Sequence, residues 1–430
     1  MMGNLLAAPD LARRLFEELA HATADTPGVT REAYGKGEAI AHAMVWREAV
    51  RLGAEIRNDA AGNLYATLPG QDRMRPALYI GSHLDSVPHG GNYDGAAGVL
   101  AGLALMAELV ARGQKPPVDL VLMVTRAEES AWFPLSYPGA QAALGRLSAA
   151  DLQARRRDTG RTLADHIRSA GFDPEPLARG EAQIDPARIA AFVEVHIEQG
   201  PNLIALGQPL GIVTAISGGQ RWPHARLTGR YAHSGAEPRF SRQDVVPGFG
   251  ELILACEQIW DRAEQAGARL TLTFGRIESD PTQHGGSVVL GDLGFSLDMR
   301  SDDAATLATV ETEVLTAIAE ITARRGLGFA PGPRMDWSPI AMDPALIRAL
   351  GRAGHSTGLD LPHLVSGGGH DAAAFAAAGI ATAMLFIRNE NGSHNPDEAM
   401  EMDDFDLAVA TLLAFTETFA TETLSSQADG

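Results

Sequence analysis

Residues 77–125, ALYIGSHLDSVPHGGNYDGAAGVLAGLALMAELVARGQKPPVDLVLMVT, contain two nearly continuous apolar runs separated by an apolar segment of helical length. The runs at 77–85 and 118–125 predict strands that are buried on both faces. The stretch from about Gly95 to Arg112 predicts a helix between them. A strand, a helix and a second strand in this order form a βαβ unit with parallel strands. The stretch therefore predicts an α/β domain with a buried sheet.

The pattern changes twice on the way to the C-terminus. Residues 189–200, IAAFVEVHIEQG, predict one more buried strand, after which strands with polar alternation and helices at 245–266 and 302–325 follow. From about residue 333 the alternation of helix, Gly-rich turn and strand returns. We therefore expect a discontinuous, mixed-sheet α/β domain of residues 1–212 and 330–430, with a smaller α+β domain of residues 213–329 inserted in it.

Composition excludes several classes of protein. The 35 basic and 54 acidic residues give a formal net charge of −19, which argues against a nucleic-acid partner. No apolar run is long enough to span a bilayer, and the N-terminus lacks the pattern of a secretory signal, so we expect a cytoplasmic protein without a membrane partner. Since Cys256 is the single cysteine, a metal site would have to use His, Asp and Glu.

Polar side chains follow the two strands of the βαβ unit. His83 ends the first strand, and Asp85 follows at the spacing that places two side chains on one face, so that a carboxylate can hold a metal-binding imidazole. Asp94 stands just before the helix, where it would commonly be a simple helix cap. Glu128 and Glu129 follow the second strand and point apart, so that one can bind a metal while the other faces a substrate.

Two more histidines come after strands elsewhere in the chain. His196 lies in the strand at 189–200, and His394 follows the last apolar strand. Each residue alone has an ordinary structural explanation, but all lie where the carboxyl ends of parallel strands place ligands. We therefore predict a metal site built from five side chains: His83, Asp94, Glu129, His196 and His394.

This ligand set is too large for one four-coordinate zinc ion. Two ions that share a bridging carboxylate need about five protein ligands. Asp94 is the natural bridge, and the glycines around it leave room for two cations near the backbone. Mixed His and carboxylate ligands suit zinc, manganese, cobalt and nickel alike, so the sequence predicts two divalent ions without choosing the element.

Seven motifs of the sequence resemble those of a known family. The motifs HLDSVPHGGNYDGAAGVLAGL, AEES, FVEVHIEQGP, GRYAHSGAEP, FSLDMR, SGGGHDAAAFA and GSHNPDEAM are similar, in this order and over nearly the whole chain, to the hydantoinase/carbamoylase amidases. That family includes N-carbamoyl-L-amino-acid hydrolases, allantoate amidohydrolases and β-ureidopropionases, within the aminoacylase and metallopeptidase clan. The resemblance implies a di-metal catalytic domain, an inserted domain that acts as a lid and in dimerisation, and a homodimer.

The resemblance also implies roles for single residues. One metal would be held by His83, Asp94 and His196, and the second by Asp94, Glu129 and His394. Asp85 would orient His83, and Glu128 would be the general base and acid. The remaining implied residues contact the substrate: His233 would polarise the scissile carbonyl, reaching into the neighbouring subunit, Arg300 would pair with the substrate carboxylate, and Gln199, Gln220 and His370 would line the pocket.

The chain departs from the family pattern at substrate-facing positions. The usual NVVPG is SVVLG here, so that Ser287 replaces an asparagine that contacts substrate elsewhere in the family. The loop after His233 reads SGAEPRF, and AWFPLSYPG follows the glutamate pair. These changes leave the metal ligands intact and bear on the identity of the substrate.

The sequence thus predicts a metal-dependent amidohydrolase that cleaves the C–N bond of an N-carbamoyl amino acid or a related ureido acid. Allantoate amidohydrolase is the first alternative, and an N-acyl-amino-acid deacylase or dipeptidase of the same clan is the second. A dinucleotide-binding oxidoreductase would also contain a βαβ unit, but GNYDGAAG lacks the GxGxxG fingerprint. A non-catalytic binding protein on the same fold is a further alternative, which metal analysis and an ammonia-release assay would separate.

Overall fold

The computed structural model describes residues 6, 8 and 10–426, with side chains up to Phe419. The described residues form two compact units: those within Met1–Thr214 and Met342–Gly430, and those of Ala215–Ala341. The inserted unit ends later than residue 329 because β12 (Gly328–Ala330) and β13 (Met335–Trp337) both pair with β7 (Gly218–Thr228). Within the described part of the chain, no helix combines the length and apolar composition needed to cross a bilayer.

The first unit is built on a mixed nine-stranded sheet in the order β1-β2-β4-β3-β5-β16-β6-β14, with β15 paired to β6. The four central strands, β4, β3, β5 and β16, are parallel to one another, while β2 and β6 join them antiparallel. The expected mixed α/β class is thus confirmed. The strands are β1 (Glu55–Asn58), β2 (Leu64–Leu68), β3 (Ala77–His83), β4 (Leu120–Thr125), β5 (Ile189–Ile197), β6 (Leu210–Ile216), β14 (Ile340–Ala341), β15 (His363–Ser366) and β16 (Thr382–Ile387).

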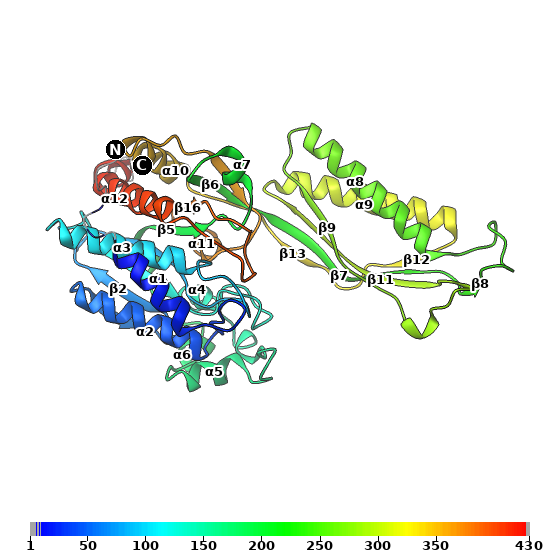
Figure 1. Cartoon of the computed structure of the whole chain (residues 1–430), viewed down its shortest axis with the longest axis horizontal. Helices are drawn as coiled ribbons and strands as arrows, with labels where there is room; N and C mark the ends of the chain where they lie inside the picture. Colours follow the sequence, from blue (N-terminus) through cyan, green and yellow to red (C-terminus); the bar gives the residue numbers. More distant parts are fainter. Residues whose placement is uncertain (1–5, 7, 9, 427–430) are drawn as a thin grey trace. The chain divides into compact units, whose positions relative to one another are not determined.

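The helices of the first unit bury the sheet. Residues of α1, α2, α3, α10 and α12 share one apolar core with the strands, and α3 lies between α1 and α12 (Figure 1). The remaining helices, α4 to α7 and α11, are short. The helices are α1 (Asp10–Ala22), α2 (Lys36–Arg51), α3 (Ala96–Ala111), α4 (Pro138–Ala143), α5 (Leu163–Ser169), α6 (Glu175–Ala178), α7 (Asn202–Leu206), α10 (Pro344–Ser356), α11 (Asp371–Ala377) and α12 (Met402–Ser426).

Helix α3 is apolar on all sides because it is buried on all sides. Every residue from Ala96 to Leu109 is buried, which agrees with its lack of a polar face. It contacts β3, β4 and β5 at once. Because β3 and β4 run parallel, with His83 opposite Thr125 in the register, the ends of these strands and the start of α3 meet at one edge of the sheet.

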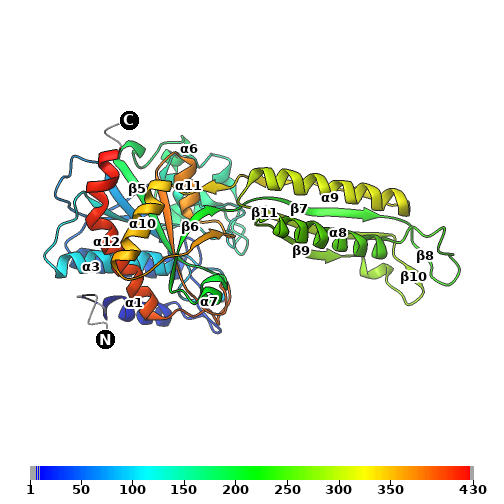
Figure 2. The ribbon, with the colours of Figure 1, turned by 90° about the horizontal axis from the view of Figure 1, so that it is seen from above.

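The second unit is a sheet covered on one face by two long helices. Its strands run in the order β12-β7-β11-β9, with β13 paired to β7, and a separate ladder joins β8 (Ala232–His233) to β10 (Val288–Val289). Helices α8 (Val245–Gln265) and α9 (Ala304–Arg325) lie side by side and share an apolar core with β7, β9 (Thr271–Glu278) and β11 (Asp292–Ser301) (Figure 2). Side chains on alternate positions of β11 therefore point toward the helices or toward the open face of the sheet.

Candidate metal centre

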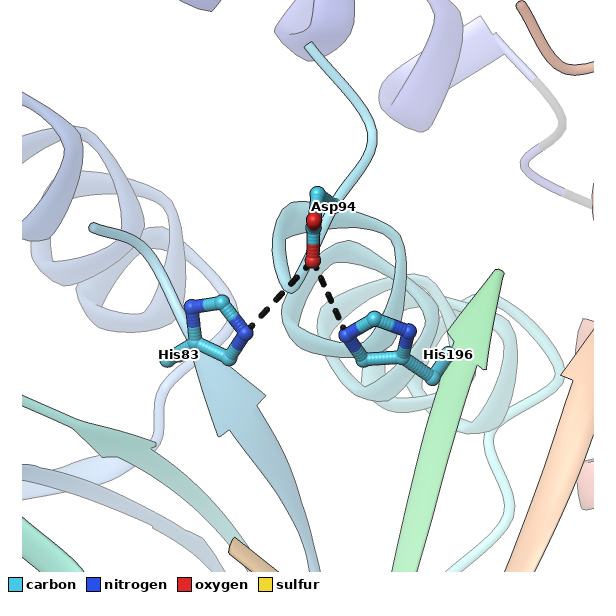
Figure 3. Close-up of side chains that lie close together, drawn as sticks. All are labelled: His83, Asp94 and His196. Atoms are coloured by element: carbon cyan, nitrogen blue, oxygen red, sulfur yellow. Dashed lines mark ion pairs between the residues drawn. The ribbon is translucent and has the colours of Figure 1, made fainter. Parts of the chain in front are cut away.

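Two histidines and one aspartate meet at the carboxyl edge of the first unit's sheet. His83 is the last residue of β3, and His196 lies one residue before the end of the parallel strand β5. Asp94 reaches both rings from the turn before α3: its Oδ1 atom lies 3.7 Å from Nε2 of His83 and 3.1 Å from Nε2 of His196 (Figure 3). All three side chains are buried. They form one group that could hold a metal ion.

Glycines allow Asp94 to approach so closely. Helix α3 begins after Gly95, whose φ is +64°, and a Cβ atom there would lie 2.5 Å from the ring of His83. A Cβ atom on Gly98 would lie 2.0 Å from the carbonyl oxygen of Val195, so only glycine lets the helix rest on the backbone of β5. Gly95, not Asp94, is the N-cap residue of α3, and within the described part of the chain no side chain caps this helix, so the alternative interpretation of Asp94 as a helix cap is wrong.

A second group shares Asp94 with the first. The Oδ2 atom of Asp94 lies 3.3 Å from Nε2 of His394, which in turn lies 3.5 Å from Oε1 of Glu129. The ligand atoms of Asp94, Glu129 and His394 lie within 4.8 Å of one another, as do those of the first group. One carboxylate therefore faces two groups of potential ligands, with one oxygen directed to each.

The charge of the centre fits divalent cations. Burial raises the pKa of Glu128 well above its ordinary value, although His83 opposes this. Burial and the charge of Asp94 raise the pKa of Glu129 to about 7. Among the described residues, Oε1 of Glu129 is buried and has no hydrogen-bond partner. Cations would neutralise this excess of buried negative charge and give that oxygen a ligand.

The same negative charge raises the pKa of the imidazoles of the centre. Burial opposes a charge on His83, but Glu128, Asp85 and Asp94 raise its pKa well above the ordinary value. The hydrogen bond to Asp94 raises the pKa of His394 to about 9. A metal ion binds the neutral imidazole, so cations would take the place of protons that this cluster otherwise attracts.

Asp85 is connected to both sides of the centre. Its backbone oxygen lies 3.0 Å from Nδ1 of His83, and its Oδ1 atom lies 3.4 Å from the same nitrogen. Its two carboxylate oxygens accept hydrogen bonds of 3.0 Å from the backbone N–H groups of Glu128 and Glu129. Asp85 thereby fixes the ring that faces Asp94 and the turn that carries both glutamates.

The sequence analysis missed three residues that hold Asp94 in place. Glu398 accepts hydrogen bonds from the backbone N–H groups of Tyr93 and Asp94, at 2.8 and 3.1 Å. Ser393 contacts Oδ2 of Asp94 at 2.7 Å and Glu398 at 2.5 Å. The fully buried Arg31 donates to the backbone oxygens of Leu84, at 2.7 Å, and of Asp94, at 3.5 Å. Glu398 lies close to His394 in sequence, but Arg31 carries no local signal.

Gln199 and His370 occupy different positions relative to the centre. The Nε2 atom of Gln199 lies 2.9 Å from Oδ2 of Asp94 and 3.5 Å from Nε2 of His394, at the second ligand group. The ring of His370 is buried, lies edge-on to His196 with the ring centres 4.5 Å apart, and contacts Ser366 through Nε2 at 2.9 Å. His370 therefore supports the ring of His196.

The inserted unit carries the other four predicted residues, in two separate places. His233 is exposed on β8, opposite Val288 of β10, and Ser287 precedes that strand. Arg300 lies on β11 and Gln220 on β7, at the end of the unit that is opposite to β8 (Figure 1). Strand β13 pairs with β7 at this same end, with Asp336 opposite Gln220.

Arg300 and Gln220 point to opposite faces of their sheet. Gln220 pairs with the buried Met299 and donates to Glu311 of α9 at 3.0 Å, on the helix-covered face. Arg300 is on the open face, where its Nε atom donates to Asp298 at 2.8 Å and its guanidinium lies 5.6 Å from the ring centre of Trp337. The structure therefore does not bring these two side chains to one ligand.

Comparison with known proteins identifies the family. Residues 79–418 match the model of peptidase family M20/M25/M40. The chain belongs to this family. The crystal structure of an amidase of the hydantoinase/carbamoylase family from Burkholderia multivorans superposes with a TM-score of 0.88 at 27% identity, covering 98% of this chain and 100% of the other. The resemblance found in the sequence motifs is thus confirmed.

Relatives of the chain include named amidohydrolases. The chain is 32% identical over 387 residues to the allantoate amidohydrolase of Escherichia coli, covering 90% of this chain and 91% of that protein. It is 30% identical over 378 residues to the N-carbamoyl-L-amino-acid amidohydrolase of Pseudomonas sp., covering 88% and 90%. This M20-family protein is accordingly an enzyme, a hydrolase of C–N bonds.

Proposed function

We propose that the protein hydrolyses the carbamoyl C–N bond of a ureido acid, with an N-carbamoyl amino acid as the first candidate substrate and allantoate as the second. The observation that carries this proposal is the division of the Asp94 carboxylate between two ligand groups, with Glu128 beside them. Two relatives that cover most of the chain are amidohydrolases of these two substrate types. The chain would act as a homodimer, with the inserted unit as lid and dimerisation domain.

His83, Asp94 and His196 would hold one divalent ion, and Asp94, Glu129 and His394 the other. Zinc, manganese, cobalt and nickel all suit these ligands. When bound, such ions make a water molecule acidic near neutral pH and polarise a carbonyl group. The rest of the chemistry belongs to side chains of the chain.

Glu128 would be the general base and acid. Its Oε2 atom lies 3.7 Å from Nε2 of His83, so the carboxylate lies at the edge of the first ligand group. From there it would take a proton from the attacking water and deliver it to the leaving nitrogen. Asp85 holds the backbone N–H of Glu128, which limits the movement of this carboxylate.

His233 is prepared to donate a hydrogen bond. Its Nδ1 atom accepts the backbone N–H groups of Gly235 and Ala236, each at 3.2 Å, so the ring proton of the neutral imidazole resides on Nε2. An exposed Nε2–H can donate to the oxygen of a scissile carbonyl and stabilise the charge that develops there. This geometry supports the role that the family resemblance implies for His233.

Arg300 would pair with the carboxylate of the substrate. Asp298 and the ring of Trp337 hold its planar guanidinium on the open face of the sheet, where a bidentate contact can form. His233 and Arg300 are separated by most of the length of β11, roughly 25 Å at about 3.3 Å per residue. One small substrate cannot contact both from the same inserted unit, which supports the contribution of His233 by a second subunit.

A substrate panel tests the proposal. The purified enzyme would be loaded with each candidate metal and incubated with N-carbamoyl-L- and D-amino acids, ureidopropionate, allantoate and N-acetyl amino acids, and the release of ammonia and amine would be measured. We expect ammonia from ureido acids of one class and none from the N-acetyl compounds. Hydrolysis of N-acetyl amino acids or dipeptides alone would replace the proposal by a deacylase or dipeptidase function.

A further inference from the structure

The turn that carries Glu128 and Glu129 is held by side chains from three other segments. Four consecutive backbone N–H groups, directly after the end of β4, each donate to a side-chain oxygen at 3.0 Å. The pairs are Arg126 to Asn63 Oδ1, Ala127 to Glu38 Oε1, Glu128 to Asp85 Oδ1, and Glu129 to Asp85 Oδ2. We call residues 126–129 the glutamate turn.

The glutamate turn contains a backbone conformation that its sequence does not favour. Ala127 has a φ of +57°, in the left-handed region that residues with a Cβ atom rarely adopt. Such a conformation persists where the surroundings determine it. Because the N–H groups of the turn have side-chain acceptors, the conformation of Ala127 is set by Glu38, Asn63 and Asp85 from outside the turn.

Glu38 makes more contacts with the glutamate turn than Asn63 does. It lies in the first turn of α2 and is fully buried. Its Oε1 atom accepts the N–H of Ala127, while its Oε2 atom accepts the guanidinium of Arg126 at 2.8 Å and the N–H of Tyr34 at 2.7 Å. Glu38 therefore binds both the backbone and a side chain of the glutamate turn.

Asn63 is itself fixed in orientation. Its Nδ2 atom donates to Asp59 Oδ2 at 2.8 Å and to the backbone oxygen of Gly139 at 2.9 Å. Both donors of the amide are thus used, and Oδ1 is left facing the N–H of Arg126. The backbone N–H of Gly139 donates in return to the oxygen of Arg126, at 3.0 Å. The start of the turn is therefore held from both sides.

We propose that Glu38, together with Asn63, is a positioning residue for Glu128: it holds the glutamate turn in the conformation that places the Glu128 carboxylate beside the metal centre. This inference rests on the proposed function, in which Glu128 transfers the proton. Rates of proton transfer depend steeply on the placement of the base, and a displacement of about 1 Å can lower turnover by about 100-fold. Among the described residues, Glu38 contacts Tyr34, Arg126 and Ala127 and none of the candidate metal ligands, so its effect on Glu128 passes through the turn.

The test compares Glu38→Gln with wild type and with Glu48→Gln. Glu48 is a matched control because it is also buried in α2 and bound to arginines, yet it contacts Arg14, Arg47 and Arg51 rather than the turn. In Glu38→Gln one acceptor oxygen is replaced by an NH₂ group. This NH₂ group would face a hydrogen-bond donor, either the N–H of Ala127 or the donors of Arg126 and Tyr34. We expect kcat to fall by about 10- to 100-fold with KM within about threefold and metal content unchanged, and Glu48→Gln to keep the wild-type kcat.

Hydrogen exchange provides a readout that is independent of turnover. The backbone N–H groups of the glutamate turn should exchange faster in Glu38→Gln than in wild type or Glu48→Gln. Glu38→Asp keeps the charge and both acceptor oxygens, and its kcat should lie between those of Glu38→Gln and wild type. If Glu38→Gln does not fold, Glu38→Asp is compared with wild type in its place. Unchanged kcat and exchange, or a loss of kcat in proportion to lost metal, would overturn the inference. An inactive wild type would refute the proposed function alone, since exchange would still decide whether Glu38 holds the turn.

Discussion

The carboxylate of Asp85 accepts the backbone N–H of Glu128 at 3.0 Å, while its other oxygen accepts that of Glu129. The same residue contacts Nδ1 of His83 through its backbone oxygen. The residue expected to orient His83 thus also sets the position of Glu128, the proposed general base. One side chain would therefore connect the candidate metal ligand to the proposed proton transfer.

Replacing Asp85 by Asn should therefore impair two properties at once. The amide NH₂ would face a backbone N–H and disturb both His83 and the glutamate turn. We expect the metal dissociation constant to rise by about 10- to 100-fold, as for other residues that orient a metal ligand. We also expect kcat to remain low even when metal is saturating. Metal titration followed by kinetics at saturation measures the two effects separately, and full recovery of kcat by added metal would limit Asp85 to orienting His83.

Glu128→Gln should strongly lower turnover without removing metal. The amide has nearly the same shape as the carboxylate but cannot accept the proton of the attacking water. We expect kcat to fall by about 100- to 10,000-fold, with metal content per subunit as in wild type. Elemental analysis and an ammonia-release assay on one preparation check both values. Substantial turnover in this variant would remove Glu128 from its proposed role.

The metal content of ligand variants should reflect the shared position of Asp94. His394 belongs to one ligand group, whereas Asp94 belongs to both. We expect His394→Ala to lose one of two bound ions and Asp94→Ala to lose both. Equilibrium dialysis with elemental analysis, using Glu48→Gln as a folded control, measures the stoichiometry. Equal losses in the two variants would contradict the shared carboxylate.

Mixed dimers should reveal whether His233 acts on the neighbouring subunit. His233→Ala should lower kcat by about 100- to 1,000-fold, the usual effect of removing an oxyanion donor, and should retain metal. When His233→Ala is mixed and reassembled with His196→Ala, one centre in a mixed dimer has both intact metal ligands and an intact partner histidine. Restored activity in the mixture supports the exchange between subunits, and its absence despite proven mixed dimers would place His233 in its own subunit's site.

The acid stability of the fold should depend on His42. Burial, with the charge of Arg126, lowers the pKa of His42 well below its ordinary value. The unfolded chain then binds a proton that the folded chain does not, so stability is lost as the pH falls below about 6.5, the ordinary pKa of histidine. In metal-free protein, His42→Leu should remove up to about 1.4 kcal/mol per pH unit from this dependence. Urea unfolding from pH 7 to pH 5, with the exposed His21→Leu as control, measures the difference; equal slopes would refute it.

The five candidate metal ligands could be predicted from the sequence mainly because the topology of the sheet determines where strand ends lie. Parallel buried strands end at one edge, so residues that directly follow apolar runs must gather there. His83, His196 and Glu129 are positioned in this way. The strand content and the βαβ unit followed from the same periodicity, and the change to polar alternation after residue 212 indicated the inserted unit.

Residues that act through long-range contacts left no comparable signal. Glu38 contacts the glutamate turn from α2, and Asn63 contacts it from the loop between β1 and β2. Arg31 contacts the backbone oxygens of Leu84 and Asp94 from the loop before α2. Their local sequence is compatible with an ordinary helix turn or loop. The orientation of Gln220 toward Glu311 depends on the register of β7 against β11, which a β-bulge alters, and no motif encodes that register.

The single carboxylate between the two ligand groups would make their occupancies interdependent. An ion held by one group would reduce the negative charge that the Asp94 carboxylate offers to the other, and it would also fix the orientation of the side chain. The first effect would weaken the second binding step, and the second effect would prepare it. Loading with metal would thus be thermodynamically coupled, and the apparent affinity for either ion would be a property of the pair rather than of one set of ligands.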